Sequence, residues 1–221
     1  MTKLRPNIVI AIDGGAASGK SSTSRELAKR FNLLHVNTGS HYRTITHALL
    51  EAGASTSDAP MVLSLLDQMI FQTRIDGQQA QLEIHQQIPT QNELRSTRVN
   101  QAVSTFAALP EVRAALFDYQ REQKQIAKQN NFAGLIMEGR DIGSIILPDA
   151  DFRFYLFAEE STRSARRASQ GEADAIAQRD KQDKQRQTAP LTCPKGAIRI
   201  DTGTLNLDGV VEHISGIIQD A

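Results

Sequence analysis

The stretch GGAASGKSS, residues 14–22, decides which fold we expect for this chain. It directly follows IVIAI, residues 8–12, a continuous apolar run that is typical of a central parallel strand buried on both faces. The spacing matches the phosphate-binding loop G-x-x-x-x-G-K-[ST], with Lys20 and Ser21 as its last two residues. In such a loop the glycines let successive backbone N–H groups face one phosphate, and the next helix adds the positive end of its dipole. The pattern therefore predicts a phosphate site between a strand and a helix.

Two side chains of this loop suit a nucleotide and its metal. Lys20 would place a full charge near the outer phosphates, and the Ser21 hydroxyl would hold Mg²⁺. Asp13, directly before the loop, either holds a water bound to Mg²⁺ or caps the turn. A glycine-rich turn that only joined a strand to a helix would need neither the lysine nor the serine, so we favour the phosphate-binding interpretation.

Strands and helices alternate along most of the chain, which predicts an α/β fold with a parallel sheet flanked by helices. Together with residues 8–12, four further apolar stretches give five expected strands. These stretches are residues 33–36, 132–137, 151–157 and 197–200.

Two parts of the chain depart from this alternation. Residues 69–88 have the pattern of two short strands around an Asp-Gly turn, so we expect a small insertion at residues 62–90. The core domain then comprises residues 1–61 and 91–221. After the fourth strand, residues 159–190 are highly charged and poor in apolar side chains. Such a segment forms either a solvated pair of helices or a mobile flap over a site.

The charge balance and the cysteine content limit the possible functions. With 25 Lys and Arg residues against 25 Asp and Glu, the net charge is zero, which argues against a general nucleic-acid or anionic-membrane surface. The single cysteine, Cys193, has no partner for an internal disulfide, which fits a reducing compartment. Every apolar run is much too short for a signal peptide or a membrane span. We therefore expect a cytoplasmic protein without nucleic-acid or membrane partners, and we take a monomer as its default state.

Arginines follow two of the expected strands and recur with helical spacing elsewhere. Arg43 comes after the second strand and Arg140 after the third. Because parallel sheets bind ligands beyond the carboxyl ends of their strands, we expect both near Lys20. Two further sets each share one helix face, which is turned either to solvent or to the site. They are Arg163, Arg166 and Arg167 in one set, and Arg179, Asp183 and Arg186 in the other.

No arrangement of side chains in the sequence suggests a covalent intermediate. The five histidines show no metal-binding spacing, and we interpret His35 as filling space beside a strand. Phosphoryl transfer needs no covalent intermediate, because it proceeds by positioning two substrates and neutralising their charge.

Several stretches, in this order, resemble the bacterial cytidylate kinase family: IAIDGGAASGKSS, VNTGSHYR, LPEVRAAL, EGRDIGSIILPDADFRFYL, RSARRA, QRDKQDKQRQTAPL and IRIDTGTLNL. The resemblance covers nearly the whole chain. It implies a P-loop NTPase-type five-stranded parallel sheet flanked by helices, an NMP-binding insertion with a β-hairpin, and a short lid at about residues 168–187. It also implies Mg²⁺-dependent phosphoryl transfer from ATP to CMP or dCMP, giving ADP and CDP or dCDP.

The resemblance implies roles for the residues that match the family's motifs. The residues implied to bind ATP are Gly14, Gly15, Ala16, Ala17, Ser18, Gly19, Lys20, Ser21 and Ser22. CMP is implied to bind through Thr38, Arg43, Arg140 and Arg186 at its phosphate, Ser104, Arg113 and Asp141 at its base, and Arg179 and Asp183 at its ribose. The implied catalytic residues are Lys20, Arg140, Arg166, Arg167 and Arg186.

The chemistry of the base supports these assignments independently. Cytosine carries an amine at C4 and acceptors at N3 and O2, so the carboxylate of Asp141 would accept from the amine and Arg113 would donate to the ring. Uracil reverses the polarity at C4 and N3. Each mispaired buried polar group costs about 1–3 kcal/mol, which corresponds to a preference of about tenfold or more.

Three features depart from the family pattern. Asn37 and Ala17 stand where the family usually has Asp and Gly. Only residues 168–178 separate Arg167 from Arg179, and the family usually has a longer segment there. Two other functions therefore stay open: another small P-loop kinase acting on UMP, AMP or a non-nucleotide alcohol, and a module that binds ATP without turning it over. The short lid favours the second of these.

Overall fold

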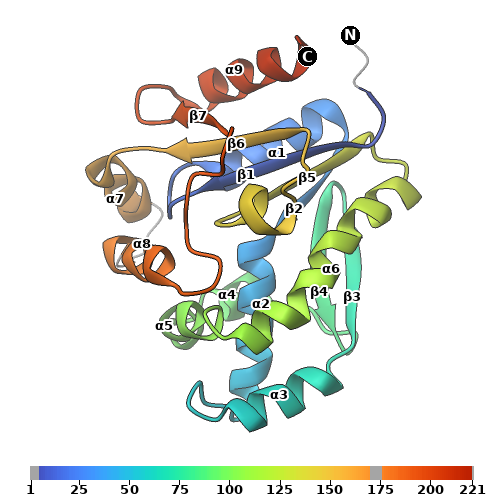
Figure 1. Ribbon diagram of the computed structural model, residues 1–221, viewed down its shortest axis with the longest axis vertical. Coiled ribbons are helices and arrows are strands. Elements are labelled where there is room, and N and C mark those ends of the chain that lie inside the picture. Colours follow the sequence, from blue (N-terminus) through green and yellow to red (C-terminus); the bar gives the residue numbers. More distant parts are fainter. Residues whose placement is uncertain (1–4, 170–175, 221) are drawn as a thin grey trace.

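The computed structural model describes residues 5–169 and 176–220 and is built on one sheet of strand order β3-β4-β2-β5-β1-β6-β7. The five strands expected from the sequence are present and pair in parallel. They are β1 (Ile8–Gly14), β2 (Leu33–Asn37), β5 (Gly134–Gly139), β6 (Phe152–Phe157) and β7 (Ile198–Asp201). Their carboxyl ends lie along one edge of the sheet (Figure 1).

The expectation of a five-stranded sheet is wrong, because the sheet has seven strands. β3 (Phe71–Asp76) and β4 (Gln79–Ile84) form the antiparallel hairpin expected around the Asp-Gly turn. β4 also pairs in parallel with β2 and so extends the sheet. The local sequence specifies the hairpin turn, but the docking of its second strand depends on burial of alternate β4 side chains such as Leu82.

Helices cover both faces of the sheet (Figure 1). The continuous apolar run of β1 is explained by this arrangement, because Ile10 packs with α1 and α9 on one face while Ala11 packs with α6 and a π-helical turn, η1, on the other. The elements named so far are α1 (Lys20–Phe31), α6 (Pro110–Gln129), η1 (Ile142–Ile146) and α9 (Leu207–Gln219).

A second group of helices packs beyond the carboxyl ends of the strands, in the lower half of Figure 1. It comprises α2 (Thr38–Glu51), α3 (Ala59–Gln68), α4 (Gln91–Leu94) and α5 (Thr97–Phe106). Asn37 begins α2 by accepting a hydrogen bond from the Ser40 N–H, and Ser96 begins α5 in the same way. Phe106 and Leu116 are fully buried between these helices and α6.

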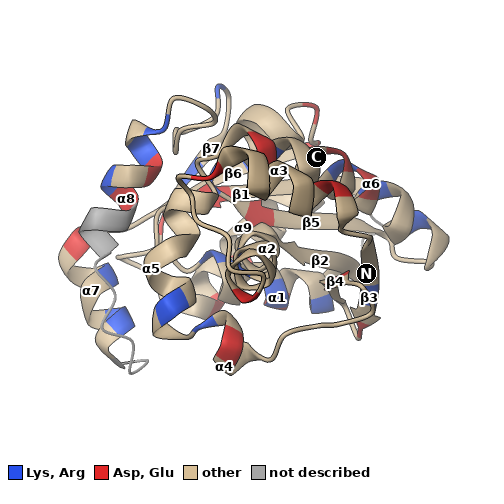
Figure 2. Ribbon diagram, turned by 90° about the horizontal axis from the view of Figure 1, so that it is seen from below, with Lys and Arg blue, Asp and Glu red and all other residues tan. Residues whose placement is uncertain are grey.

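The charged segment after β6 forms a pair of helices in the part that the structure describes. These are α7 (Glu160–Ser169) and α8 (Ile176–Gln185), and Figure 2 shows basic and acidic residues gathered on both. The described parts of this segment are therefore largely helical, as the first of the two alternatives requires. Among residues 5–169 and 176–220, no helix combines the length and apolarity that crossing a bilayer requires.

Candidate active site

The loop predicted to bind phosphate joins the end of β1 to the start of α1. Gly14 has φ 153°, and a Cβ there would lie 2.1 Å from the backbone oxygen of Leu156 on β6, so only glycine fits. Ala17 has φ 55°, in the left-handed region that favours glycine. Although the residue is alanine, the backbone at position 17 therefore has a conformation that glycine usually adopts.

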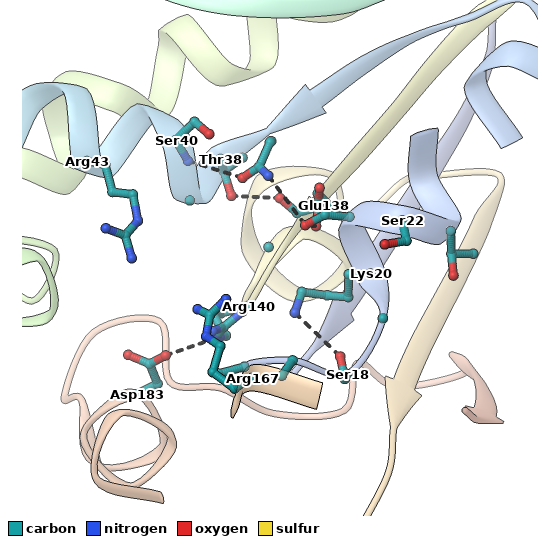
Figure 3. A pocket seen from close by; sticks show the side chains of 18 of the residues that line it. Ser18, Lys20, Ser22, Thr38, Ser40, Arg43, Glu138, Arg140, Arg167 and Asp183 are labelled. Carbon is teal, nitrogen blue, oxygen red and sulfur yellow. Dashed lines mark hydrogen bonds and ion pairs between the residues drawn. The ribbon is translucent and has the colours of Figure 1, made fainter. Parts of the chain in front are cut away.

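A pocket of about 570 Å³ lies beside this loop and brings together most of the predicted site residues (Figure 3). Those that line it are Ala16, Ala17, Ser18, Gly19, Lys20, Ser21, Ser22, Thr38, Arg43, Ser104, Arg140, Asp141, Arg166, Arg167, Asp183 and Arg186. Gly14, Gly15, Asp13 and Arg113 lie outside the lining. Arg179 belongs to α8, but its side chain lies outside the described part of the structure.

Lys20 is buried at the base of the pocket, with its ammonium held by the loop itself. Nζ donates to the Gly15 carbonyl at 2.7 Å and to Ser18 Oγ at 3.5 Å. Burial, followed by the positive charge of Arg140, lowers the pKa of Lys20 to about 7. A buried lysine beside an arginine is costly unless an anion joins them, which is what a phosphate site provides.

Ser21 contacts a carboxylate that the sequence analysis missed. Its Oγ donates to Glu138 Oε2 at 2.8 Å, and His35 Nε2 lies 3.0 Å from Glu138 Oε1. The interpretation of His35 as a space-filling residue is therefore wrong. Burial tends to raise the pKa of Glu138, but the hydrogen bond and charge of His35, the charge of Lys20 and the Ser21 hydrogen bond bring it below its ordinary value.

Glu138 had a signal in the sequence. It stands at the carboxyl end of a buried strand, directly before the Gly-Arg-Asp turn, where a carboxylate reaches the ligand edge of a parallel sheet.

Asp13 is fully buried and joins two parts of the backbone. Its oxygens accept hydrogen bonds from the N–H groups of Ile142 (2.7 Å) and Gly143 (2.8 Å) at the start of η1. Burial raises the pKa of Asp13 to about 6, although both amides oppose that shift. These bonds fix the turn after β5 to the end of β1, and a role toward a Mg²⁺-bound water stays a prediction.

Asp183 on α8 holds two of the predicted arginines together. Arg140 Nε donates to Asp183 Oδ2 at 2.9 Å, as the dashed line in Figure 3 shows, and Arg186 donates to Asp183 Oδ1. Because the carboxylate is nearly fully buried, this is an ordered, charge-assisted arrangement. Burial lowers the pKa of Arg186 from its ordinary value.

The remaining pocket arginines come from α2 and α7. Arg43 Nη1 donates to the Leu94 carbonyl and to Asn100 Oδ1, each at 2.7 Å, which links α2 to α4 and α5. Arg166 Nη1 donates to Thr202 Oγ1 at 3.1 Å, just after β7. Arg167 points into the same pocket (Figure 3). Cationic side chains from distant parts of the sequence therefore surround one cavity.

Arg113 and Asp141, predicted to recognise the base, contact each other directly. Arg113 Nη2 donates to Asp141 Oδ2, and Nη1 donates to the Ala107 carbonyl at 3.1 Å. The Arg113 guanidinium also lies 5.4 Å from the centroid of the Tyr42 ring. Burial raises the pKa of Asp141, partly offset by Arg113. Asp141 lines the pocket and Arg113 supports it from behind.

A model of the family described as cytidylate kinase matches residues 10–220. The chain belongs to the cytidylate kinase family. A cytidylate kinase from Exiguobacterium sp. is 33% identical, with 98% of this chain and 99% of the relative covered. One from Bdellovibrio bacteriovorus is 37% identical, covering 94% of this chain and 95% of the relative. The resemblance in the sequence to cytidylate kinases is thus confirmed.

A solved structure supports the fold independently of sequence. A sugar kinase from Janibacter sp. superposes with a TM-score of 0.50 at 9% identity, covering 96% of this chain and 94% of that one. At this low identity the likeness concerns the α/β architecture alone, whereas membership of the cytidylate kinase family follows from the sequence matches.

Proposed function

We propose that this chain transfers the γ-phosphoryl group of ATP to CMP or dCMP, giving ADP and CDP or dCDP. One observation carries the proposal: the loop with Lys20 shares a single pocket with Arg43, Arg140, Arg167 and further arginines (Figure 3). A pocket that gathers this much positive charge in a chain of zero net charge suits two phosphorylated substrates placed end to end.

The ATP phosphates would lie against residues 14–22 and the amino end of α1. Lys20 would neutralise charge on the transferring group, and Arg166 and Arg167 on α7 would approach it from the opposite side. The oxygens of Ser21 and Glu138 fit a hard cation such as Mg²⁺. When bound, Mg²⁺ supplies charge neutralisation on the phosphates.

The acceptor would lie at the other end of the pocket. Thr38, Arg43, Arg140 and Arg186 would hold its phosphate, with Asp183 keeping the last two arginines in position. Ser104 and Asp141 line the part of the pocket that would receive cytosine, and Arg113 and Asp141 present the donor and acceptor that its ring requires. Asp183 and Arg179 are the candidates for the ribose.

Catalysis would rest on positioning and charge. The phosphate of CMP is already ionised at neutral pH, so no general base is needed, and in-line transfer requires alignment and stabilisation of the developing charge. We also propose that residues 62–90 act as the NMP-binding insertion, that residues 168–187, of which 170–175 lie outside the described part of the chain, act as a lid, and that the enzyme is a cytoplasmic monomer. The first of these proposals is supported by the pairing of β4 with β2, because β2 leads directly into α2, which carries Thr38 and Arg43.

A panel of acceptors tests the proposal. Production of ADP from Mg·ATP would be followed with CMP, dCMP, UMP and AMP in turn, and without an acceptor. We expect kcat/KM for CMP and dCMP to exceed the values for UMP and AMP by about tenfold or more. Equal rates with UMP would refute the base recognition by Asp141 and Arg113. Absence of ADP with every acceptor, together with retained binding of ATP, would indicate a module that binds ATP without turnover.

A further inference from the structure

Ala16, in the phosphate loop, is held at both ends by an oppositely charged pair. Its N–H donates to Asp180 Oδ1 at 2.9 Å, and its carbonyl accepts from Arg163 Nη1 at 2.9 Å. Arg163 and Asp180 also form an ion pair with each other, and their side chains are only 12% and 9% exposed. Arg163 belongs to α7 and Asp180 to α8, so both helices grip one residue of the loop.

Both side chains also lie against the neighbouring loop residue Gly15, and a side chain there would force them to shift. A Cβ on Gly15 would lie 2.7 Å from Asp180 Oδ2 and 3.0 Å from Arg163 Nη1. Arg163 is further oriented by the Ala158 carbonyl, to which its Nε donates at 3.1 Å. The contact is therefore closely packed and directional, and no part of it depends on a long, solvent-exposed ion pair.

A second connection joins the same helix to the loop two residues later. Arg166, one turn after Arg163, donates to Thr202 Oγ1, and that hydroxyl donates to the Ser18 carbonyl at 3.0 Å. α7 thus reaches the loop carbonyls of Ala16 and Ser18, directly in one case and through Thr202 in the other. These hydrogen bonds fix the position of α7, which carries Arg166 and Arg167, relative to the loop.

The electrostatics explain why a carboxylate is tolerated beside a phosphate site. An isolated Asp180 would repel an anionic ligand, but Arg163 neutralises it within the pair. The Ala16 N–H is taken up by Asp180, so this amide orients the loop from outside the pocket. Asp180 therefore helps to fix the backbone conformation of the loop at Ala16.

We propose that Arg163 and Asp180 are positioning residues that couple the α7–α8 pair to the phosphate loop. They keep Ala16 in the conformation that presents the loop to phosphate, and they hold Arg166 and Arg167 at the pocket while the loop has that conformation. This inference rests on the proposed function only in that the bound phosphates are those of ATP.

The test compares Asp180→Ala, Asp180→Asn, Arg163→Ala and the double variant Arg163→Ala/Asp180→Ala with the unaltered chain. Lys181→Ala is the matched control, because Lys181 is the next residue on α8 and is exposed. Asp180→Asn keeps an oxygen for the Ala16 N–H and removes the charge that pairs with Arg163, so it separates the two contacts with little change in shape. Thermal unfolding of each variant confirms that it is folded.

Two readouts are needed. The first is KM for ATP and for CMP, measured separately with kcat. The second is hydrogen–deuterium exchange of the backbone over residues 14–19, with and without ATP, which does not depend on turnover. If the chain proved inactive toward CMP, exchange would still test the coupling, so failure of the proposed function and failure of this inference are distinguishable.

We expect each alanine variant to raise KM for ATP about tenfold, the effect of losing a charge-assisted hydrogen bond. KM for CMP should stay within about twofold, exchange over residues 14–19 should become faster, and the double variant should be no worse than the worse single variant, because the two residues act as a unit. Asp180→Asn should fall between Asp180→Ala and the unaltered chain. The inference is overturned if the variants match Lys181→Ala, if the single effects add, or if KM for CMP rises in proportion.

Discussion

The guanidinium of Arg113 and the carboxylate of Asp141 form a hydrogen-bonded ion pair in which both side chains are more than nine-tenths buried. Removing one partner leaves a buried charge uncompensated. We expect Asp141→Ala to lower the free energy of unfolding by about 3–5 kcal/mol, measured by urea denaturation. Arg98→Ala, which breaks the exposed pair with Glu51, should cost less than about 1 kcal/mol. Equal losses from the two variants would contradict this account.

Lys20→Met should separate activity from stability. Loss of the charge that faces the transferring phosphoryl group should lower kcat by about 10²–10³-fold. Because burial lowers the pKa of Lys20 to about 7, its charged form is costly in the folded chain, so the variant should be at least as stable as the original. Lys29→Met, at an exposed position on the same helix, is the control for both measurements. Near-normal turnover by Lys20→Met would refute the role proposed for this lysine.

Glu138 should determine how tightly Mg²⁺ is held. It accepts from Ser21 and is itself held by His35, and loss of such a supporting carboxylate typically weakens metal binding about 10–100-fold. Glu138→Gln should therefore raise the Mg²⁺ concentration for half-maximal activity at fixed ATP by at least about tenfold, and removal of Mg²⁺ by a chelator should abolish turnover. Glu26→Gln, on α1 with a side chain that is 43% exposed, should leave the Mg²⁺ titration unchanged. An unchanged titration for Glu138→Gln as well would exclude this role.

His41 should make the fold sensitive to acid. It is fully buried, and neither ring nitrogen has a hydrogen-bond partner within the described part of the chain. Burial lowers the pKa of His41 from 6.5 to about 3. Between these values the unfolded chain binds a proton that the folded chain does not, so the free energy of unfolding falls as the pH decreases, by about 2 kcal/mol at pH 5.

His41→Leu removes this proton linkage. The variant should lose less stability than the original chain between pH 7 and pH 5 in chemical denaturation. His213→Gln, at an exposed position, provides the comparison variant for the effect of replacing a histidine on the surface. Parallel pH curves for His41→Leu and the original chain would show that His41 has the same pKa in the folded and unfolded states, and would contradict this prediction.

Local patterns predicted the parts of the fold and site that depend on local sequence. The phosphate loop, the five parallel strands and the arginines that follow strands were all recognisable, because each is specified by spacing over a few residues or by the direction of a parallel sheet. The sequence resemblance predicted the family, and the match of the cytidylate kinase family model to residues 10–220 confirms it.

Features that depend on register between distant segments were missed. His35 meets Glu138 because β2 pairs with β5 so that Asn37 lies opposite Glu138, and no spacing in the sequence contains that information. The grip of Arg163 and Asp180 on Ala16 joins residues more than a hundred positions apart. The docking of the hairpin on β2 was missed for the same reason. The Asp-Gly turn predicts that β3 pairs with β4, but it contains no information on which other strand β4 pairs with.

The place of that hairpin in the sheet limits how the chain can be cut or recombined. β4 borders β2, and β3, whose residues are alternately exposed and carry Arg74 and Asp76, forms the outer margin. Excising the hairpin would leave β2 as an open edge of the sheet, and grafting the hairpin onto another scaffold would leave β4 as one. In both cases the edge would carry unpaired backbone groups. We expect such a truncated chain to self-associate before any change in its affinity for nucleotides is detected.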